Sequence, residues 1–380
     1  MDKNKLKIVI ATGILPPDIG GPATYVLRLA RHLEKLGHEV KIVTYGDGET
    51  KVVVGNDRDF SLHIVNKRLP LQIRYFKYFK EIKKLAKWAD VVYAQDLVST
   101  GLPCAWAKIA KPKMKLVARL GGDFLWEKAY NMGWTDKPLS QYHAQPKNVQ
   151  EKIYLTVYKF VLKKLDKIIF STKWQSQIYE QFFHTGAKSE IIENAFPKAA
   201  VGLENNTSSK NILFAGRLIK LKNLSRLIEA IGESCDVKLT IVGSGPEKDN
   251  LEKEIKAFSL EDRVTIKPRV SSVKLDQYIA DSFLVIVPSI SEVSPNIALE
   301  CIRLGKPILL TKECGYAQRY KDELIFIDPF SISDMKEKIC GLLDESNHKN
   351  YLAKIANIDT SRSWQDLAKE HVDLFSKLPR

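Results

Sequence analysis

Short apolar runs alternate with amphipathic stretches along almost the whole chain. Residues 6–11 (LKIVIA) form an apolar run of strand length, apolar positions recur at helical spacing from Val26 to Leu33, and residues 39–44 (EVKIVT) form the next strand-like run. Parallel strands need a crossover of this kind, because both must start at the same edge of their sheet. The pattern therefore predicts an α/β fold in which helices cover parallel sheets.

The alternation occurs in two rounds, which predicts two domains. First-round strands are also expected at 62–65, 90–94, 115–119 and 167–171, and helices near 72–88, 100–110, 151–165 and 173–183. Second-round strands are expected at 211–215, 237–242, 263–266, 283–287, 307–310 and 324–327, and helices near 222–231, 246–258, 273–280, 295–304 and 331–343. The length of 380 residues also exceeds the roughly 250–300 at which single cores stop growing. The polar residues 202–210 are the expected linker.

Positive charge is concentrated in the first half of the chain. Residues 1–200 carry 33 Lys and Arg against 19 Asp and Glu, whereas residues 201–380 carry 26 of each. An excess of this kind favours contact between the N-terminal half and an anionic membrane surface, a polyanion or an acidic acceptor.

Composition and the N-terminus favour a cytoplasmic protein. No run approaches the ~18 uncharged apolar residues of a membrane span, and the first residues lack the apolar core and cleavage site of a secretory signal. The five cysteines are scattered without a C-x-x-C pair, which predicts buried thiols rather than disulfides or a zinc site. No histidines have metal-ligand spacing, so we expect no metal.

The segment SEVSPNIALECIRLGKP places two carboxylates on either side of a predicted helix start. Ser294 suits the N-cap and Pro295 the first helical position. Glu300 then lies within the helix, and Glu292 lies in the loop after the strand FLVIV. Ligands of open parallel sheets bind beyond the carboxyl ends of the strands, where this loop is expected.

The start of the same helix is suited to an anion. Its unpaired amides, including those of Asn296 and Ile297, offer a phosphate or a sugar oxygen the positive end of the helix dipole. The alternative is an ordinary capped helix with solvated carboxylates.

A second candidate lies at the first strand of the second round, in FAGRLIKLKNLSRLIEAI. Arg217 and Lys222 flank the turn into the next helix, where two cations can balance the charge of a diphosphate. The alternative is two solvated basic side chains in a loop. Gly20 and Gly21 before the first helix, and Gly243 in VGSGPEK, allow a phosphate to approach the backbone closely, although a plain turn explains them equally well.

A long polar and aromatic segment follows the strand that ends in VARL. It begins with Gly121, Gly122 and Asp123, continues with several aromatic residues, and is expected to lack regular structure to about residue 148. Loops of this length within a compact domain are often functional. Asp123 is therefore a candidate contact for a sugar hydroxyl or an acceptor; the alternative is a surface loop whose aromatic rings pack inward.

Two further patterns each allow two interpretations. Residues 74–88 (RYFKYFKEIKKLAKW) place aromatic and aliphatic residues on one stripe and lysines on another, as in a helix lying on anionic lipid or in a domain helix with a basic outer side. Asp57 and Asp59 form the D-x-D of metal-dependent sugar transferases of a single-domain fold, but a solvated turn is favoured.

The order of these motifs resembles the family-4 retaining glycosyltransferases, which have the two-domain GT-B fold. The resemblance spans nearly the whole chain and consists of a Gly-Gly loop, a G-R-L…K-N stretch, a V-G-x-G-P turn and an E-x7-E segment. In this chain the four motifs are, in the same order, Gly20–Gly21, Gly216–Leu218 with Lys222–Asn223, Val242–Pro246 and Glu292–Glu300. This implies two tandem Rossmann-like doubly wound domains facing across a cleft.

The resemblance also implies domain roles. Residues 1–203 would form an acceptor-binding domain, residues 204–360 a domain that binds the nucleotide-sugar donor, and residues 361–380 a helix that returns to the first domain. No cofactor or metal is implied.

Roles for individual residues follow from the same resemblance. Arg217 and Lys222 would bind the donor diphosphate, Glu300 the ribose and Glu292 the donor sugar. Gly20, Gly21 and Gly243 would lie near the donor phosphates, and the backbone of Ser294, Pro295, Asn296 and Ile297 would line the sugar. Many members have a catalytic His followed by Asp here, whereas this chain has Gly121, Gly122 and Asp123. The expected catalytic residues are therefore Glu292 and, as the substitute for that His, Asp123.

The expected function is transfer of a hexosyl group from a UDP- or GDP-sugar to a glycan or lipid-linked acceptor with retention. Cell-envelope polysaccharide or glycolipid synthesis at the inner face of the membrane is the expected setting. Two alternatives are a GT-B-fold nucleotide-sugar epimerase, which would need no acceptor, and a non-catalytic polyanion-binding protein. The balanced charge of the second half and the lack of a nucleic-acid motif argue against the last.

Overall fold

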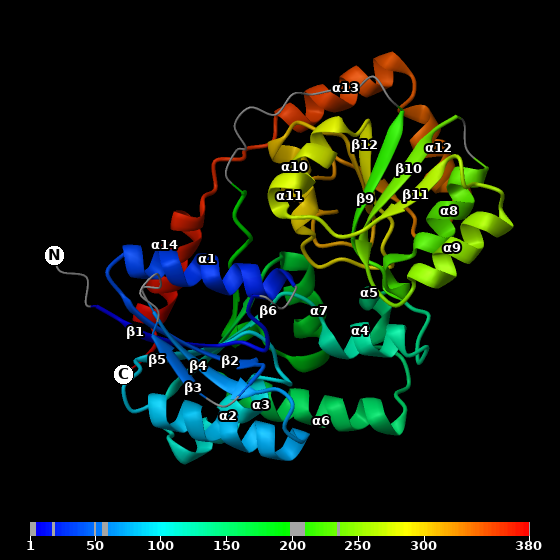
Figure 1. Cartoon of the computed structure of the whole chain (residues 1–380). Helices are drawn as coiled ribbons and strands as arrows, with labels where there is room; N and C mark the ends of the chain where they lie inside the picture. Colours follow the sequence, from blue (N-terminus) through cyan, green and yellow to red (C-terminus); the bar gives the residue numbers. More distant parts are fainter. Residues whose placement is uncertain are drawn as a thin grey trace. The chain divides into compact units, whose positions relative to one another are not determined.

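The computed structural model describes residues 5–16, 20–48, 51–54, 60–197, 210–233 and 236–379 (Figure 1). The chain forms two compact units. The first comprises Met1–Leu125, Pro146–Ala195 and Arg362–Arg380, and the second comprises Trp126–Gln145 and Phe196–Ser361. Each unit is built on its own mainly parallel sheet, so the predicted pair of α/β domains is confirmed. The predicted boundary at residue 203 and the D-x-D at Asp57 and Asp59 lie outside the described residues.

The first unit has an eight-stranded sheet in the order β3-β4-β2-β1-β5-β6-β7-β8. Its strands are β1 (Lys7–Ala11), β2 (Glu39–Gly46), β3 (Lys51–Val54), β4 (Ser61–Asn66), β5 (Val91–Ala94), β6 (Lys115–Leu120), β7 (Lys167–Phe170) and β8 (Ser189–Ile191). Neighbouring strands are parallel except β3 and β4. The sequence predicted the strands of the parallel part within one or two residues but missed the short edge strands β3 and β8.

The helices of the first unit cover both faces of this sheet. They are α1 (Gly21–Lys35), α2 (Leu71–Leu85), α3 (Gly101–Ala110), α6 (Val149–Lys164), α7 (Lys173–Phe183), the 3-10 turn η1 (Gly186–Lys188) and α14 (Trp364–Ser376). Helix α1 connects β1 to β2, towards the β3 edge of the sheet, whereas α2 and α3 lead to β5 and β6, towards the β8 edge. Because crossovers between parallel strands are right-handed, α1 lies on the opposite face from α2 and α3. Figure 1 shows α1 beside α14 on one face, and α2, α3 and α6 on the other.

The C-terminal helix α14 returns to the first unit and completes its core. Trp364 packs edge-on against Tyr25 of α1 at 5.5 Å, and His371 is fully buried. Nδ1 of His371 lies 2.8 Å from the Leu367 carbonyl, which can only accept, so Nδ1 carries the proton. Nε2 is therefore an acceptor, and the hydroxyls of Tyr25 and Tyr93 lie 3.1 and 3.0 Å from it.

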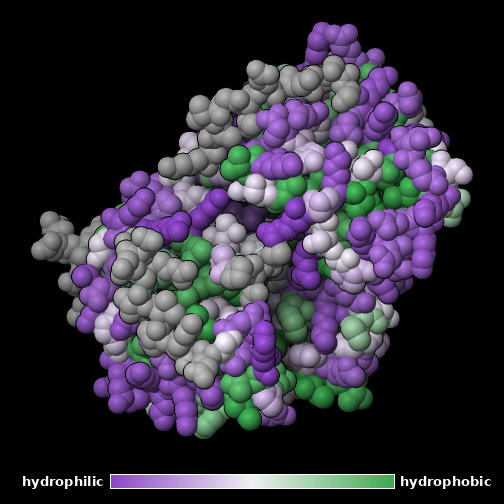
Figure 2. Space-filling model, viewed as in Figure 1, coloured by the Kyte–Doolittle hydropathy of each residue, from purple (hydrophilic) through white to green (hydrophobic). Residues whose placement is uncertain are grey.

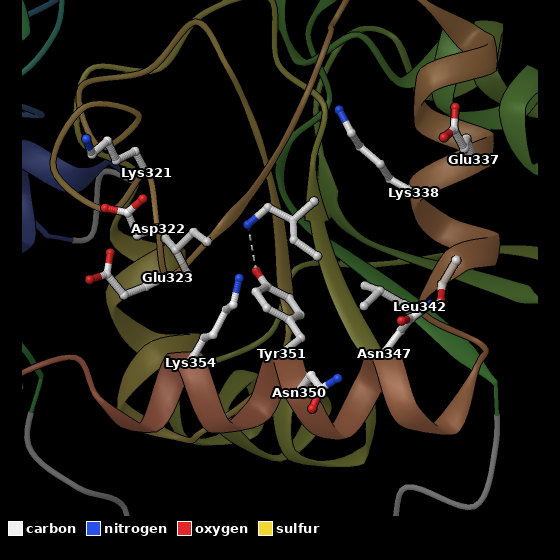
Figure 3. Close-up of a pocket in the computed structure, with 13 residues that line it drawn as sticks. Lys321, Asp322, Glu323, Glu337, Lys338, Leu342, Asn347, Asn350, Tyr351 and Lys354 are labelled. Atoms are coloured by element: carbon white, nitrogen blue, oxygen red, sulfur yellow. Dashed lines mark hydrogen bonds between the residues drawn. The ribbon is translucent and has the colours of Figure 1, made fainter.

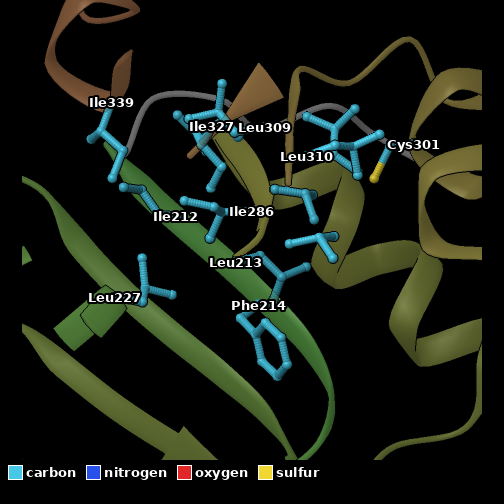
Figure 4. Packing of buried hydrophobic residues seen from close by; sticks show 14 of the residues in the cluster. Ile212, Leu213, Phe214, Leu227, Ile286, Cys301, Leu309, Leu310, Ile327 and Ile339 are labelled. Atoms are coloured by element: carbon cyan, nitrogen blue, oxygen red, sulfur yellow. The ribbon is translucent and has the colours of Figure 1, made fainter. Parts of the chain in front are cut away.

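The second unit has a six-stranded, wholly parallel sheet in the order β11-β10-β9-β12-β13-β14. Its strands are β9 (Asn211–Arg217), β10 (Lys238–Ser244), β11 (Val264–Lys267), β12 (Leu284–Val287), β13 (Ile308–Thr311) and β14 (Ile325–Ile327). Leu213, Ile286 and Leu309 lie at the centre of its core (Figure 4), as expected for strands buried on both faces.

Helices cover the second sheet and carry hydrophilic side chains on their outer surface, as seen over α9 and α13 in Figure 2. They are α8 (Leu224–Gly232), α9 (Lys248–Ala257), α10 (Ser272–Asp281), α11 (Asn296–Arg303), α12 (Ile332–Gly341) and α13 (Glu345–Ala356), with the 3-10 turn η2 (Lys220–Lys222) before α8. Two sequence predictions need correction here. The sequence did not predict α13, and α11 begins one residue later than expected, with Pro295 rather than Ser294 at its N-cap.

The segment of residues 126–145, called the inserted segment below, belongs to the second unit although both flanking segments belong to the first. The expectation of a structureless loop here was wrong. The segment holds most of α4 (Phe124–Asn131) and all of α5 (Leu139–Tyr142). The indole of Trp126 is 3% exposed and donates to the Lys137 carbonyl at 3.0 Å, which closes the segment on itself.

The cysteines differ in part from the prediction of thiols throughout. Cys104, Cys301 and Cys314 are free and buried, as predicted. Cys340 is disulfide-bonded, and Cys235 lies outside the described residues. The prediction failed at Cys340 because spacing along the sequence carries no information about which cysteines meet in space.

Strands β9 and β10 lie so close at Gly243 that a side chain does not fit. A Cβ atom there would lie 2.0 Å from the Gly216 carbonyl oxygen, whereas a Cβ at Gly341, at the end of α12, would meet nothing within 4 Å. We expect Gly243→Ala to lower the free energy of unfolding by about 1–3 kcal/mol. Gly341→Ala should instead raise it by about 0.5–1 kcal/mol, because alanine loses less backbone entropy. Urea unfolding of the two variants checks this, and equal effects would contradict it.

His371 should make stability depend on pH. Burial lowers the pKa of its imidazole from 6.5 to about 3, so only the unfolded chain takes up this proton between those values. Stability from the neutral ring is complete above pH 6.5 and is lost as the pH falls. We expect the destabilisation caused by His371→Gln to shrink by about 1.4 kcal/mol per pH unit below pH 6.5. Urea unfolding between pH 8 and pH 5 measures it; a difference that stays constant with pH would disprove the assignment.

Candidate donor site of the second unit

The candidate site lies at the carboxyl edge of the second sheet, where the loops after β9, β10 and β12 are joined by backbone hydrogen bonds. The amide of Leu218 donates to the Ser244 carbonyl at 3.0 Å, and the amide of Ile290 donates to the Leu221 carbonyl at 2.9 Å. These bonds bring the predicted residues after β9 next to those after β12. The carboxyl edge is where ligands of open α/β sheets bind.

Lys222 and Glu292 form an ion pair at this edge. The side chains are 21% and 15% exposed, and the Glu292 carboxylate also accepts from the Ser289 hydroxyl at 2.7 Å. The backbone of Glu292 is fixed as well, because its amide donates to the Glu313 carbonyl at 2.9 Å and its carbonyl accepts from Gly315 at 3.1 Å. Seventy positions separate the two partners, so the sequence did not reveal the pair.

Arg217 is exposed at the end of β9 and has a different environment from Lys222. It lines a cavity of about 270 Å³ together with Lys220 and Glu247 of the β9 and β10 loops and Glu127 and Asn131 of the inserted segment. The structure thus brings the two predicted cations to the same edge but leaves Arg217 open to solvent and Lys222 bound to a carboxylate.

The remaining predicted residues of this unit lie around the same edge. Ser294 and Pro295 precede α11, and the exposed Asn296 and half-buried Ile297 begin it. Glu300 is half-buried in the middle of that helix. Gly243 is at the end of β10, where the close approach to Gly216 already requires a glycine. The first amides of α11 provide a positive helix end beside the loop that carries Glu292.

Three predicted residues lie in the first unit. Gly20 and Gly21 stand at the start of α1, and a Cβ on Gly20 would lie 2.7 Å from the end of the Ile14 side chain. Asp123 is 1% exposed, and its carboxylate accepts from the hydroxyls of Tyr158 and Tyr179 at 3.4 and 3.0 Å. Asp123 is therefore buried among aromatic residues after β6.

The inserted segment adds contacts that the sequence did not predict. The Leu139 amide donates to the Ser291 hydroxyl at 2.9 Å, and the Ser140 hydroxyl donates to the Glu313 carboxylate at 2.6 Å. Ser291 directly precedes Glu292, and the Glu313 carbonyl accepts a hydrogen bond from the Glu292 amide. Burial raises the pKa of Glu313, although the bond from Ser140 opposes this shift. The segment therefore braces the loop that carries Glu292.

A second part of the inserted segment lies beside η2. Tyr130 lines a cavity of about 470 Å³ with Arg226, Asn223 and Lys220. Burial raises the pKa of the Tyr130 hydroxyl, and the charge of Arg226 opposes the shift. No periodicity marks Tyr130 or Ser140 as site residues, so sequence reasoning had no signal for either.

A separate cavity of about 430 Å³ in this unit lies between α12, α13 and the residues before β14 (Figure 3). Tyr351 lines this cavity. Its hydroxyl accepts from the Ile325 amide at 3.2 Å and donates to the Ile308 carbonyl. Ile308 and Ile325 begin their strands, so the cavity is at the amino edge of the sheet and is not part of the site. Among the described residues, no three His, Cys, Asp or Glu side chains cluster as metal ligands, and no helix is long and apolar enough to span a membrane.

Family comparisons agree with this geometry. The model of glycosyltransferase family 4 matches residues 19–198, and that of glycosyl transferases group 1 matches residues 197–358. The chain is 23% identical to an uncharacterized glycosyltransferase of Methanocaldococcus jannaschii, with 97% of this chain and 98% of the relative covered. The chain therefore belongs to the family-4 glycosyltransferases and is a transferase.

Solved structures show the same GT-B fold. A sucrose-phosphate synthase from Thermosynechococcus elongatus superimposes with a TM-score of 0.77 at 17% identity, covering 98% of this chain and 99% of that one. HepE of Anabaena, solved in complex with UDP-glucose, gives a TM-score of 0.76 at 16% identity, covering 98% and 100%.

The Lys222–Glu292 pair should be energetically coupled. Because both side chains are largely buried, removing one partner leaves the other charge without compensation. A double-mutant cycle of Lys222→Met and Glu292→Gln should give a coupling energy of about 1–3 kcal/mol in urea unfolding. The control cycle, Lys312→Met with Asp328→Asn, removes a more exposed pair at 2.7 Å and should give less than about 1 kcal/mol. Equal coupling in the two cycles would show that Lys222 and Glu292 are not a buried pair.

Proposed function

We propose that this protein transfers a hexosyl group from a UDP- or GDP-sugar, bound by the second unit, to a glycan or lipid-linked acceptor with retention of anomeric configuration. The observation that carries the proposal is the meeting of Arg217, the Lys222–Glu292 pair and the first turn of α11 at one carboxyl edge. This combination offers positive charge to a diphosphate and a fixed carboxylate to a sugar.

The donor diphosphate would be held by charge and by backbone amides. Arg217, open to solvent at the end of β9, supplies a bidentate guanidinium, and the start of α11 supplies the positive end of the helix dipole. Lys222 is already paired, so it would lie between the diphosphate and Glu292 and fix one relative to the other. Glu300, further along α11, would bind the ribose.

Glu292 would orient the donor sugar rather than act alone as a base. Its carboxylate is held by Lys222 and Ser289, and its backbone by the chain around Glu313. A carboxylate fixed in this way can hold sugar hydroxyls through the transition state without reorganising.

The chemical step would depend on charge stabilisation. Breaking the anomeric bond leaves negative charge on the diphosphate and positive charge on the sugar, and Arg217 with the α11 dipole would stabilise the leaving group. We propose same-face attack, with the leaving phosphate taking the acceptor proton, and we include no metal or cofactor because the chain's own cations supply the charge.

The first unit would bind the acceptor, with Gly20 and Gly21 near the donor phosphates. We propose that the acceptor belongs to cell-envelope polysaccharide or glycolipid synthesis and that the protein acts in the cytoplasm. For Asp123, burial against Tyr158 and Tyr179 supports a role in holding the loop after β6.

Donor hydrolysis tests the proposal without a known acceptor. One nucleotide sugar of a UDP and GDP panel should raise the melting temperature and be slowly hydrolysed. Arg217→Gln should lower that hydrolysis roughly 100-fold or more, because it removes one donor to the leaving group. Folding should be unaffected, since Arg217 is exposed.

Lys238→Gln is the matched control. Lys238 is also exposed but begins β10 at the opposite edge of the sheet, so its loss should leave hydrolysis unchanged. If no nucleotide sugar is bound or hydrolysed, or if both variants lose activity equally, the proposed site is wrong. Interconversion of the sugar with no hydrolysis would indicate an epimerase.

A further inference from the structure

The outer surface of α2, α3 and α6 in the first unit combines exposed apolar side chains with lysines. The three helices lie side by side on one face of the sheet, α2 packed on α3 and α3 on α6 (Figure 1). We call their exposed side the basic-apolar face. Its large hydrophobic residues, 36% to 74% exposed, are Leu71, Ile73, Phe76, Trp106, Ile109, Val149 and Ile153.

The charge of these helices is almost entirely positive. Together they contain ten Lys and Arg but only two carboxylates, Glu81 and Glu151. Glu81 bonds to His63 at 2.7 Å, and Glu151 is 3% exposed within the capping box of α6. The structure describes every residue of these three helices, and none of them is an exposed carboxylate.

On α2 the lysines and the apolar side chains share the outer side of one helix. Ile73, Phe76, Lys77, Lys80 and Lys84 follow one another at helical spacing and are all exposed. The Lys80 ammonium lies 4.6 Å from the centre of the Phe76 ring. Lysines with apolar neighbours of this kind can extend their charges to phosphate groups while rings and aliphatic chains enter the acyl boundary.

A lysine-rich cavity lies at the end of the same layer. It measures about 650 Å³ and is formed partly by the last turns of α3 and α6. Two carboxylates, Asp166 and Glu190, line it, and they are bonded to Lys108 and Lys167. Six lysines line the cavity: Lys108, Lys163, Lys164, Lys167, Lys188 and Lys377. The positive surface of α3 and α6 therefore extends into a cavity large enough for a phosphate-bearing headgroup.

We propose that the basic-apolar face docks on the surface of an anionic lipid bilayer. Charge complementarity selects the anionic surface, and the exposed Leu, Ile, Phe, Trp and Val side chains distinguish a bilayer from a purely polyanionic partner such as nucleic acid. Docking itself does not depend on enzymatic activity. That it brings the enzyme to a lipid-linked acceptor rests on the proposed function.

Vesicle flotation of the full chain tests the docking. We expect the protein to float with vesicles of phosphatidylcholine and phosphatidylglycerol, and not with pure phosphatidylcholine. Lys77→Ser with Lys80→Ser should lower the partition coefficient roughly 30-fold, at about fivefold for each lysine near the surface. Ile73→Ser with Phe76→Ser should also weaken binding at least tenfold, because both apolar side chains would leave the bilayer.

Two matched controls remove the same kinds of side chain elsewhere. Arg31→Ser with Lys35→Ser takes two exposed charges from α1 on the opposite face of the sheet, and Phe258→Ser with Val273→Ser takes two exposed apolar side chains from the second unit. Each control should change partitioning less than threefold. Equal loss in a control, or equal binding to neutral and anionic vesicles, would overturn the proposal.

A nucleic-acid surface gives a different result. In that case the lysine variant would lose binding to a single-stranded oligonucleotide. The variant of Ile73 and Phe76 would still float with anionic vesicles like the wild type. These two results together would overturn bilayer docking. Donor hydrolysis by Arg217→Gln is measured without vesicles. Failure of docking and failure of the proposed function are therefore visible separately.

Discussion

The carboxyl edge of the second sheet depends on one buried side chain, that of Asn223. Its backbone has a φ of 58°, a conformation that asparagine tolerates better than most residues, and it directly precedes α8. Its amide group donates to the carbonyls of Pro288 and Pro329 at 3.0 and 2.7 Å. Loops after β9, β12 and β14 are thereby fixed to one another. Lys222 is the preceding residue, so the same anchor sets where its ammonium meets Glu292.

The sequence predicted the regular parts of both sheets well, because strands buried on both faces are continuous apolar runs and their helices have a clear period. It missed β3 and β8, which are short and form the two edges of the first sheet, and α4 and α5, whose aromatic residues pack without a simple period. The N-cap of α11 was misplaced by one residue because Ser294 and Pro295 both fit the start of a helix.

The sequence predicted which loops form the candidate site, but not which of their side chains contact one another. The ends of the strands predicted that these residues lie at the carboxyl edge, since the residues that follow β9, β10 and β12 in a parallel sheet lie on one side of it. They could not show that Lys222 is paired with Glu292 while Arg217 is open, because that difference arises from contacts between segments 70 residues apart. For the same reason, the sequence did not predict the hydrogen bonds that Leu139 and Ser140 donate to Ser291 and Glu313.

The charge of the first half has a structural explanation in one helical layer. Helices α2, α3 and α6 hold ten of the 33 Lys and Arg of residues 1–200 but only two of the 19 Asp and Glu. Like charges on one surface repel and do not stabilise a fold. The opposite layer pairs Arg362 with Glu370, and the second half is balanced overall, so the sequence does not need this excess to fold. A surface that is both basic and apolar at a cost to stability is best explained by what it contacts outside the molecule.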